Sequence, residues 1–327
     1  MRYFVIDCSI KLKLITFLSD GNMYSGEKLG RILGISRAAV NKHISQLKEW
    51  GLNIHSMPSQ GYILLTPIQL LDSVMILSKL NNPSISIINI VDSTNQYLLE
   101  RIDILQSGDT CIAEYQQAGR GRRGRQWFSP FGANLYLSMY WRLDQGPESV
   151  VGLSLVVSVI LAEVLWKIGI TDIRVKWPND IYLYDRKVGG ILVELIGATG
   201  DTAKIVIGIG INISMYTSNN LLINQNWINL DAAGIQINRN ELAAQLINHL
   251  RYSLYQFEQQ GFNAFIKRWL KLDNFINRPV KLLLANQEVY GISRGIDRQG
   301  RLLLEQANGK IKSWVSGDIS LRIQQKD

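Results

Sequence analysis

The sequence predicts a multidomain α/β (α+β) protein with a winged helix-turn-helix, a central domain built on a mixed sheet, and a small C-terminal β-barrel of the SH3-like type. Three observations predict this fold class. Residues 1–66 read as helices followed by a hairpin, residues 67–272 alternate strands with helices, and residues 273–327 hold short apolar strands between turns. We therefore expect domain boundaries near residues 66 and 272.

The N-terminal segment has the pattern of three helices and a wing. Leu12–Leu18 reads as a first helix, and Ser25 and Ser36 stand where they can cap a second and a third. Gly51 ends the third helix, and Ile54–Leu65 reads as a hairpin. Helices joined by a tight glycine-containing turn and followed by a hairpin indicate a winged helix-turn-helix.

The third predicted helix has one apolar and one polar face. Val40, Ile44 and Leu47 recur at helical spacing, so they form the core side. The opposite side offers residue types that contact phosphates and base edges, namely Arg37, Asn41, Lys42 and Gln46. We expect these four to bind DNA. A small helical docking module is the alternative that this pattern leaves open.

The central segment alternates strand and helix signals. Strands are expected at Ile85–Val91, Thr110–Tyr115, Leu135–Trp141, Ile173–Trp177, Gly190–Leu195 and Ala203–Ile213. A short helix follows Asp92–Asn95, Val150–Trp166 reads as a buried helix, and Asn240–Gln259 reads as an amphipathic helix with Asn240 as its cap. Thr217–Asn229, rich in Asn and Ser, reads as a mobile loop. After Asp273, strands are expected at Val280–Leu284, Val289–Ile296, Leu302–Glu305 and Ile311–Val315.

Composition limits the class of protein. The 327 residues are 46% hydrophobic and 19% charged, as in globular proteins, and the net charge of +8 favours an anionic partner such as nucleotide or nucleic acid. Cys8 and Cys111 form neither a disulfide framework nor a metal-binding spacing. The most apolar stretch, Val150–Leu165, is too short to span a bilayer and contains Glu163. We expect a cytoplasmic protein without a membrane segment.

Residues 119–125 read Gly-Arg-Gly-Arg-Arg-Gly-Arg. Glycine lets backbone N–H groups converge on a ligand, and arginine matches phosphate and carboxylate oxygens, so this loop is suited to a polyanion. The loop contains Gly-x-Gly-x-x-Gly, but Pro130 and Gly132 disfavour the helix that a Rossmann site needs after it. No Gly-Lys-Ser/Thr follows at the spacing of a P-loop.

A second group of motifs lies at 176–191. Asp180 follows a strand and a proline, and its carboxylate is a candidate for holding Mg²⁺ on a nucleotide. Lys187 precedes Gly189-Gly190, which lets the backbone approach a ligand closely; a surface hairpin with a solvated lysine is the alternative. No histidine accompanies a plausible nucleophile or metal cluster, which disfavours acyl-enzyme and zinc chemistry. Cations, backbone amides and one carboxylate suit nucleotidyl transfer to an acid.

In this order the motifs resemble those of the biotin protein ligases. The heptad with Trp127 and Phe128, Lys176-Trp177-Pro178-Asn179-Asp180, Lys187 with Gly190, and Gly210-Ile211-Asn212 carry the resemblance. With the winged helix, nearly the whole chain is similar to the enterobacterial bifunctional members, which also repress the biotin operon. The resemblance implies that biotin and Mg·ATP give biotinyl-5′-adenylate, and that biotin then passes to a lysine of the biotin carboxyl carrier protein of acetyl-CoA carboxylase.

The resemblance also implies roles for particular residues. Biotin binding is expected of Ser93, Thr94, Asn95, Gln116, Arg120, Gly121, Arg122 and Lys187. Arg122, Lys187 and Asp180 are expected to be catalytic, with Lys187 neutralising charge between the carboxylate and the α-phosphate. Asp180 would hold Mg²⁺ on the nucleotide, and Asn212 would contact the edge of the adenine. Trp227 lies in the Asn-rich loop that is expected to close over the adenine.

Regulation and partners follow from the same resemblance. It implies that the adenylate acts as corepressor, and that a ligand-bound homodimer binds operator DNA through its two winged helices. The dimer surface is expected near the heptad and the loop 144–149. Two alternatives remain: a non-catalytic sensor of a biotin-like effector, and a lipoate ligase. Arg322 either reaches the nucleotide or carrier, or is an ordinary surface arginine.

Overall fold

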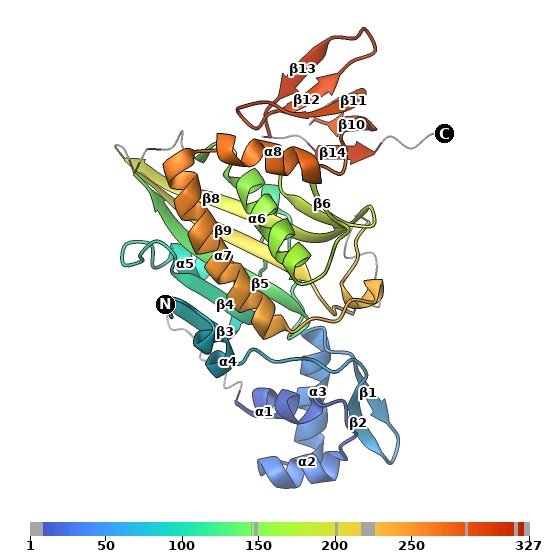
Figure 1. The fold of residues 1–327 in the computed structure, drawn as a ribbon. Coiled ribbons are helices and arrows are strands. Elements are labelled where there is room, and N and C mark those ends of the chain that lie inside the picture. The colour runs from blue at the N-terminus through green and yellow to red at the C-terminus, as the bar shows by residue number, and fades with distance from the viewer. Residues whose placement is uncertain are drawn as a thin grey trace.

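The computed structural model describes residues 9–144, 146, 150–199, 202–216, 226–284, 287–316 and 320–323. A helical N-terminal domain, a central sheet domain and a C-terminal β domain follow one another along the molecule (Figure 1). This order of three parts confirms the predicted fold class. The boundaries near residues 66 and 272 stay predictions.

The N-terminal domain is a three-helix unit with a two-stranded wing. Its elements are α1 (Ser9–Leu18), α2 (Gly26–Leu33), α3 (Arg37–Glu49), β1 (Ile54–Met57) and β2 (Gly61–Leu64). Both predicted N-caps are confirmed, because Ser25 Oγ accepts from the Lys28 amide and Ser36 Oγ from the Ala39 amide, each at 3.1 Å. Each such cap contributes about 1 kcal/mol.

The central domain is built on a seven-stranded mixed sheet with the order β3-β4-β5-β9-β8-β7-β6. Its strands are β3 (Ile85–Val91), β4 (Thr110–Gln116), β5 (Asn134–Leu143), β6 (Ile173–Lys176), β7 (Asp180–Leu183), β8 (Arg186–Thr199) and β9 (Thr202–Asn212). The pair β3–β4 is parallel and the other neighbours are antiparallel. The mixed sheet is as predicted, although β7 was not expected as a separate strand.

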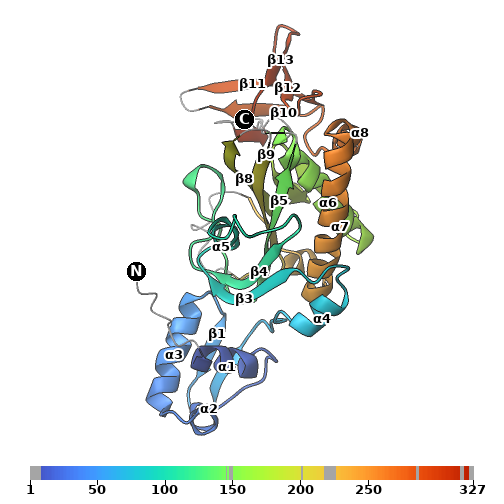
Figure 2. The same ribbon diagram turned by 90° about the vertical axis from the view of Figure 1, so that its left-hand side faces the viewer.

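Helices cover this sheet unequally. They are α4 (Ser73–Ser78), α5 (Thr94–Leu99), α6 (Leu153–Lys167), α7 (Arg239–Gln260) and α8 (Asn263–Leu272), of which α4 and α8 were not predicted. Figure 2 shows the sheet between α6 and α7 on one side and α5 on the other. The side with α5 is therefore less covered by helices.

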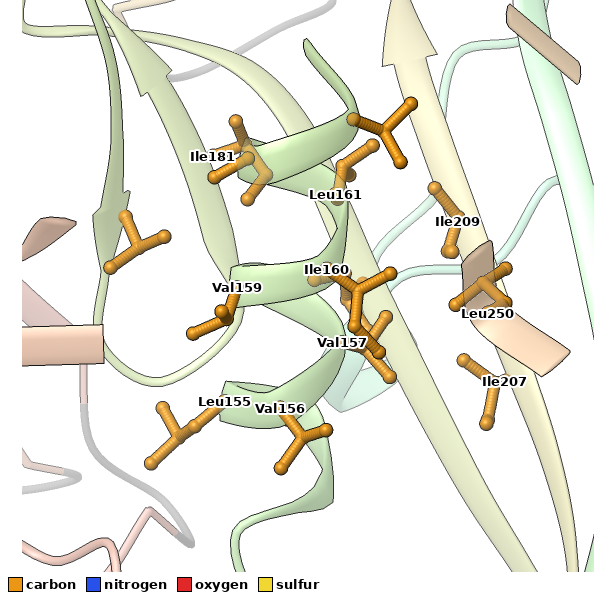
Figure 3. Close-up of a cluster of buried hydrophobic side chains, with 14 of the residues drawn as sticks. Leu155, Val156, Val157, Val159, Ile160, Leu161, Ile181, Ile207, Ile209 and Leu250 are labelled. Atoms are coloured by element: carbon orange, nitrogen blue, oxygen red, sulfur yellow. The ribbon is translucent and has the colours of Figure 1, made fainter. Parts of the chain in front are cut away.

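The main core lies between the sheet and the two long helices. Figure 3 shows Val157 and Ile160 of α6 facing Ile207 and Ile209 of β9, with Leu250 of α7 beside them. All five side chains are at most 3% exposed. The predicted buried helix is confirmed: α6 is apolar around most of its circumference. Among the helices in the described part of the chain, none is long and apolar enough to cross a membrane.

The start of α7 corrects one prediction. Asn238, rather than Asn240, is the N-cap, and its Oδ1 accepts from the amides of residues 240 and 241. Asn240 is 2% exposed; its Oδ1 accepts from the Asp72 amide, and its Nδ2 donates to the Leu70 carbonyl. The predicted cap residue therefore ties the linker after the winged helix to α7. Nothing local distinguishes the two asparagines, since the partners of Asn240 are about 170 positions away.

The C-terminal domain is a five-stranded antiparallel sheet with the order β13-β12-β11-β10-β14. The strands are β10 (Pro279–Leu283), β11 (Glu288–Ile296), β12 (Leu302–Glu305), β13 (Ile311–Trp314) and β14 (Ser320–Ile323). The antiparallel β character is confirmed, and β14 was not predicted. Closure into a barrel is not seen, because β13 and β14 do not pair within the described residues.

An aromatic sandwich joins the N-terminal domain to the central one. The Trp50 ring, just after α3, stacks on Tyr115 of β4 and on Phe131, with centroid distances of 5.4 and 5.9 Å. The Phe131 amide also donates to the Trp50 carbonyl at 2.9 Å. Each aromatic pair contributes about 0.5–1.5 kcal/mol beyond burial, so the sandwich holds the C-terminal end of α3 against the sheet.

The carboxyl group of Asp273, just after α8, is buried at the entry to the C-terminal domain. Its Oδ1 accepts from the Phe275 amide at 2.9 Å, whereas Oδ2 is buried without a hydrogen-bond partner. Burial raises the pKa of Asp273 to about 7, and the Phe275 amide lowers it by less. Since the pKa is higher in the folded than in the unfolded chain, the free energy of unfolding falls as pH rises from about 4 to about 7.

We therefore expect Asp273→Asn to become more stable relative to the wild type as pH rises from about 5 to about 8, by about 1 kcal/mol or more. Urea unfolding of both proteins across this range measures the difference. Asp172→Asn, at an exposed aspartate, serves as control. Parallel stability curves for wild type and Asp273→Asn contradict the prediction.

Candidate active site

A cavity of about 130 Å³ lies on the face of the sheet that carries α5. Its lining comes from the start of α5, the heptad loop, the segment 176–180, strands β8 and β9, and β14. Nine of the residues predicted as site residues line it: Ser93, Thr94, Asn95, Gln116, Arg120, Gly121, Arg122, Asp180 and Lys187. Positions separated by up to about 90 residues in the sequence are thus brought together.

One part of the lining is an uncharged hydrogen-bond network. Gln116 Oε1 accepts from the Thr94 amide at 2.9 Å and its Nε2 donates to Ser129 Oγ at 2.9 Å. Ser138 Oγ of β5 donates to Thr94 Oγ1 at 2.7 Å and lies 2.5 Å from Asn95 Oδ1. These side chains are 8% exposed or less. Their orientation is fixed before any ligand arrives, because each partner holds the next.

Glycines of β9 let other groups approach the sheet. A Cβ at Gly208 would lie 2.3 Å from Asn95 Oδ1, and one at Gly210 would lie 2.5 Å from the Trp127 ring. The Trp127 indole Nε1 is buried without a hydrogen-bond partner. Glycine is therefore required at both positions by close packing and not by backbone conformation.

The heptad forms a compact loop at the mouth of the cavity. Arg123 and Gly124 have φ angles of 61° and 69°, so the chain reverses here through the left-handed region. Arg122 Nη1 donates to Asn179 Oδ1 at 3.1 Å, and its Nη2 donates to the Ser316 carbonyl of the C-terminal domain. Arg120 pairs with Glu194 of β8 at 2.7 Å. The loop thus connects the central sheet with the C-terminal domain.

A second part of the lining is charged. Lys187 Nζ lies 2.8 Å from Asp180 Oδ1 and 5.3 Å from the centroid of the Trp127 ring. Burial raises the pKa of Asp180, but Lys187 and Lys176 outweigh it and hold that pKa below its usual value. Burial also lowers the pKa of Lys176 to about 7, despite the nearby Asp180. The Lys176 amine donates to Tyr182 Oη at 2.8 Å.

The donor set does not fit a protein-held Mg²⁺. The carboxylate of Asp180 is already paired with Lys187, and Lys176 lies 4.0 Å away. No group of three or more metal-ligating side chains occurs among the residues that the structure describes. A magnesium ion normally keeps phosphate oxygens and waters around one or two carboxylates. The described residues therefore do not form a Mg²⁺ site of their own, and the expected role of Asp180 toward Mg²⁺ on a bound nucleotide stays a prediction.

Two predicted nucleotide-binding residues lie outside the cavity lining. Asn212, at the end of β9, donates its Nδ2 to the Ile228 carbonyl at 3.3 Å. Trp227 pairs with Lys187 through the backbone, since the Lys187 amide donates to Asn226 and the Ile228 amide to Lys187. Both therefore support the strand that carries Lys187. Most of the predicted loops 217–229 and 144–149 lies outside the described residues.

Sequence reasoning missed several cavity residues. Gly208, Ile209 and Leu192 line the cavity and were not singled out. Arg322, left open between two interpretations, lines it as well. Ser138 and Glu194 stand behind the lining and orient Thr94, Asn95 and Arg120. Neither carries a motif, because polar residues on long strands look like ordinary solvent-facing positions.

The predicted DNA-binding residues share the outer side of α3. Arg37, Asn41 and Lys42 are exposed, and Gln46 is half-buried. Asn41 Oδ1 accepts from Tyr62 Oη of the wing at 3.3 Å. The helix therefore presents a polar, partly basic side to solvent while its other side builds the core.

Comparison with known proteins agrees with this organisation. Residues 87–212 match the Biotin/lipoate A/B protein ligase family, 275–322 the Biotin protein ligase C terminal domain, and 11–63 an HTH domain. The bifunctional ligase/repressor BirA of Escherichia coli is 59% identical and covers 98% of this chain and 99% of its own. The bifunctional ligase/repressor BirA of Bacillus subtilis is 28% identical, over 93% of this chain and 96% of its own.

A solved structure shares most of the fold. The biotin protein ligase from Aquifex aeolicus, in complex with biotin and ATP, has a TM-score of 0.64 and 28% identity, over 74% of this chain and 99% of that chain. The BirA of Salmonella typhimurium is 60% identical over 97% of this chain and 98% of its own. With such identity over nearly its whole length, the chain belongs to the family of bifunctional ligase/repressor proteins of the BirA type.

Proposed function

We propose that this chain is an ATP-dependent biotin ligase, acting on the biotin carboxyl carrier protein of acetyl-CoA carboxylase, and also a repressor of the biotin operon. One observation carries the ligase activity: a single cavity has an uncharged hydrogen-bond network in one part and a lysine–arginine group in another. Biotin has matching parts, a neutral cyclic urea and a carboxylate joined by an aliphatic chain.

The network and the glycines orient biotin. Thr94, Asn95 and Gln116 supply the donors and acceptors that a urea needs, and their orientation is fixed by mutual bonds. The bare backbone at Gly208 and Gly210 lets Asn95 and the Trp127 ring lie directly against the sheet, and we propose that the aliphatic chain passes beside the Trp127 ring. The carboxylate then points toward Lys187 and Arg122.

In the first step a carboxylate oxygen of biotin attacks the α-phosphorus of ATP. A carbon–oxygen–phosphorus link forms while the bond to pyrophosphate breaks, and pyrophosphate leaves with the electron pair. As the new bond forms, the carboxylate and the α-phosphate, both anionic, are brought together, so negative charge is concentrated on their oxygens. Lys187 and Arg122, fixed by Asp180 and Asn179, stabilise this charge without having to reorganise. In this proposal Mg²⁺ would be bound to the phosphates of ATP.

In the second step a deprotonated lysine amine of the carrier protein attacks the acyl carbon. A carbon–nitrogen bond forms, the carbon–oxygen bond to AMP breaks, AMP leaves with the electron pair, and the amine nitrogen releases one proton to solvent. The adenylate is a mixed anhydride that water also attacks, so the site must exclude water between the steps. The heptad loop, held to Asn179 and to the C-terminal domain by Arg122, is the cover we assign to this task.

The exposed side of α3 supports the repressor role. Arg37, Asn41, Lys42 and Gln46 form the face that we propose contacts operator DNA. A homodimer formed in the adenylate-bound state would place two such helices on two half-sites. The protein is then a cytoplasmic regulator whose DNA binding reports that adenylate is present and not yet consumed.

One experiment separates this function from the two alternatives. The protein is incubated with ATP, Mg²⁺, an apo carrier domain and either labelled biotin or labelled lipoate. We expect label transfer from biotin and none from lipoate. Transfer of lipoate alone identifies a lipoate ligase, and operator binding without any transfer identifies a sensor.

We expect Arg122→Gly to release biotinyl-5′-adenylate about 10 to 100 times faster than the wild type. The variant loses the hydrogen bonds from the heptad loop to Asn179 and Ser316. Together these bonds stabilise the closed loop by a few kcal/mol. Stopped-flow dissociation of the adenylate measures the rate. Arg298→Gly, on an exposed turn of the C-terminal domain, is the control; an unchanged rate for Arg122→Gly refutes the assigned role.

We expect Lys42→Ala to weaken operator binding about tenfold and to leave biotin transfer unchanged, because one basic DNA contact is lost far from the cavity. Fluorescence anisotropy at fixed salt measures binding of the adenylate-bound protein. Lys13→Ala, at an exposed lysine of α1, is the matched control in the same domain. Equal affinities for the two variants speak against α3 as the DNA-binding helix.

A further inference from the structure

Glu194 of β8 bonds to two cavity residues without lining the cavity itself. Its Oε1 pairs with Arg120 Nη2 at 2.7 Å, and its Oε2 accepts from Asn95 Nδ2 at 2.7 Å. The side chain is 18% exposed, whereas that of Arg120 is 42% exposed. Arg120 and Asn95 are both among the residues expected from the sequence to bind biotin. One carboxylate thus fixes two of these side chains at once.

The bonds of Glu194 extend the uncharged network described above. Asn95 uses its Oδ1 toward Ser138 and its Nδ2 toward Glu194, so its amide orientation is set from both sides. Arg120 Nη1 donates to Gln96 Oε1 at 3.1 Å, which fixes the guanidinium plane from a second direction. The first arginine of the heptad is therefore held against α5 and β8.

Charge is distributed unevenly along the cavity. Arg120 is paired with Glu194, so this part carries no net charge. The other lining cations are Arg122, Arg123, Arg125, Lys176, Lys187 and Arg322, and Asp180 is the one carboxylate among the described lining residues. Lys187 is itself paired with Asp180, but Arg125 and Arg322 are close enough to act on the charge of the neighbouring Lys176, so positive charge exceeds negative charge in this part of the cavity.

The strand register separates these two parts. Gly190 pairs with Gly210, Leu192 with Gly208, and Glu194 with Val206. From Gly190, next to Lys187 Nζ, to Glu194 the strand advances four residues, which is about 13 Å. A ligand lying along β8 and β9 therefore meets a cationic group at one end and a neutralised arginine at the other.

We propose that Glu194 is a positioning residue that selects for a neutral head group by cancelling the charge of Arg120. With Glu194 present, Arg120 acts as an oriented hydrogen-bond donor and not as a free cation. A substrate with one carboxylate then binds in a single direction, with that carboxylate at Lys187. This inference rests on the proposed function, since the neutral head group is the cyclic urea of biotin.

Removing the charge of Glu194 should change selectivity as well as affinity. Glu194→Gln keeps the size of the side chain but leaves Arg120 as an unpaired cation. An anionic head group then gains an attractive partner, while a urea loses the oriented donor. A purely structural role of Glu194 would weaken all ligands alike.

The experiment compares two probes by isothermal titration on the full chain: biotin and octanedioate, a flexible dicarboxylate without a urea. In Glu194→Gln we expect biotin to bind about tenfold more weakly, and the ratio of the two dissociation constants to shift at least about tenfold toward octanedioate. Arg120→Gln and the double variant, which combines Glu194→Gln with Arg120→Gln, complete a double-mutant cycle. We expect the double variant to recover the wild-type preference against octanedioate, because it has no unpaired cation.

Glu163→Gln is the matched control, because Glu163 also pairs with an arginine, Arg268, at similar exposure but remote from the cavity. We expect it to bind both probes as the wild type does. Unchanged dissociation constants in Glu194→Gln, or equal weakening of both probes, overturn the proposal. Failure of the wild type to bind biotin at all would instead overturn the proposed function, and this inference with it.

Discussion

The antiparallel pairing of β8 with β9 across unsubstituted glycines is the constraint on which the rest of the site depends. Gly190 faces Gly210, and Gly208 lies two residues along. A Cβ at Gly208 would collide with Asn95 and one at Gly210 with Trp127, while one at Gly190 would lie only 3.1 Å from the Trp127 ring. The bare backbone lets the Trp127 indole and the polar network lie directly on the sheet. On the other face, Ile207 and Ile209 pack against α6 and α7, so one strand builds both the core and the cavity.

The strand β4 connects the helical layer and the cavity of the central domain with the N-terminal domain. Glu114 forms a buried ion pair with Arg239 of α7 and accepts from the Leu71 amide of the linker. Tyr115 stacks on Trp50 of the N-terminal domain. Gln116 lines the cavity and bonds to Thr94. Three consecutive residues thus contact the helical layer, the DNA-binding domain and the ligand site, so a shift of β4 reaches all three.

Local signals were predictable from the sequence, and long-range ones were not. The caps Ser25 and Ser36 were found because a serine and the amide it binds are three residues apart. The cavity residues were found through motifs and their resemblance to a family. Glu194 and Ser138 were missed because their partners are 99 and 44 positions away. The open edge between β13 and β14 likewise depends on strand pairing that turn signals do not determine.

The cavity wall is made of segments from distant parts of the chain. Ser93 belongs to the first third of the sequence, whereas Leu321 and Arg322 lie on the last strand. A nascent chain emerges from the ribosome in order, and domains fold as their residues become available. The winged helix can therefore fold long before the cavity is complete. A partially synthesised chain is able to present α3 but not a finished ligand site, because the cavity wall is complete only once residue 322 has emerged.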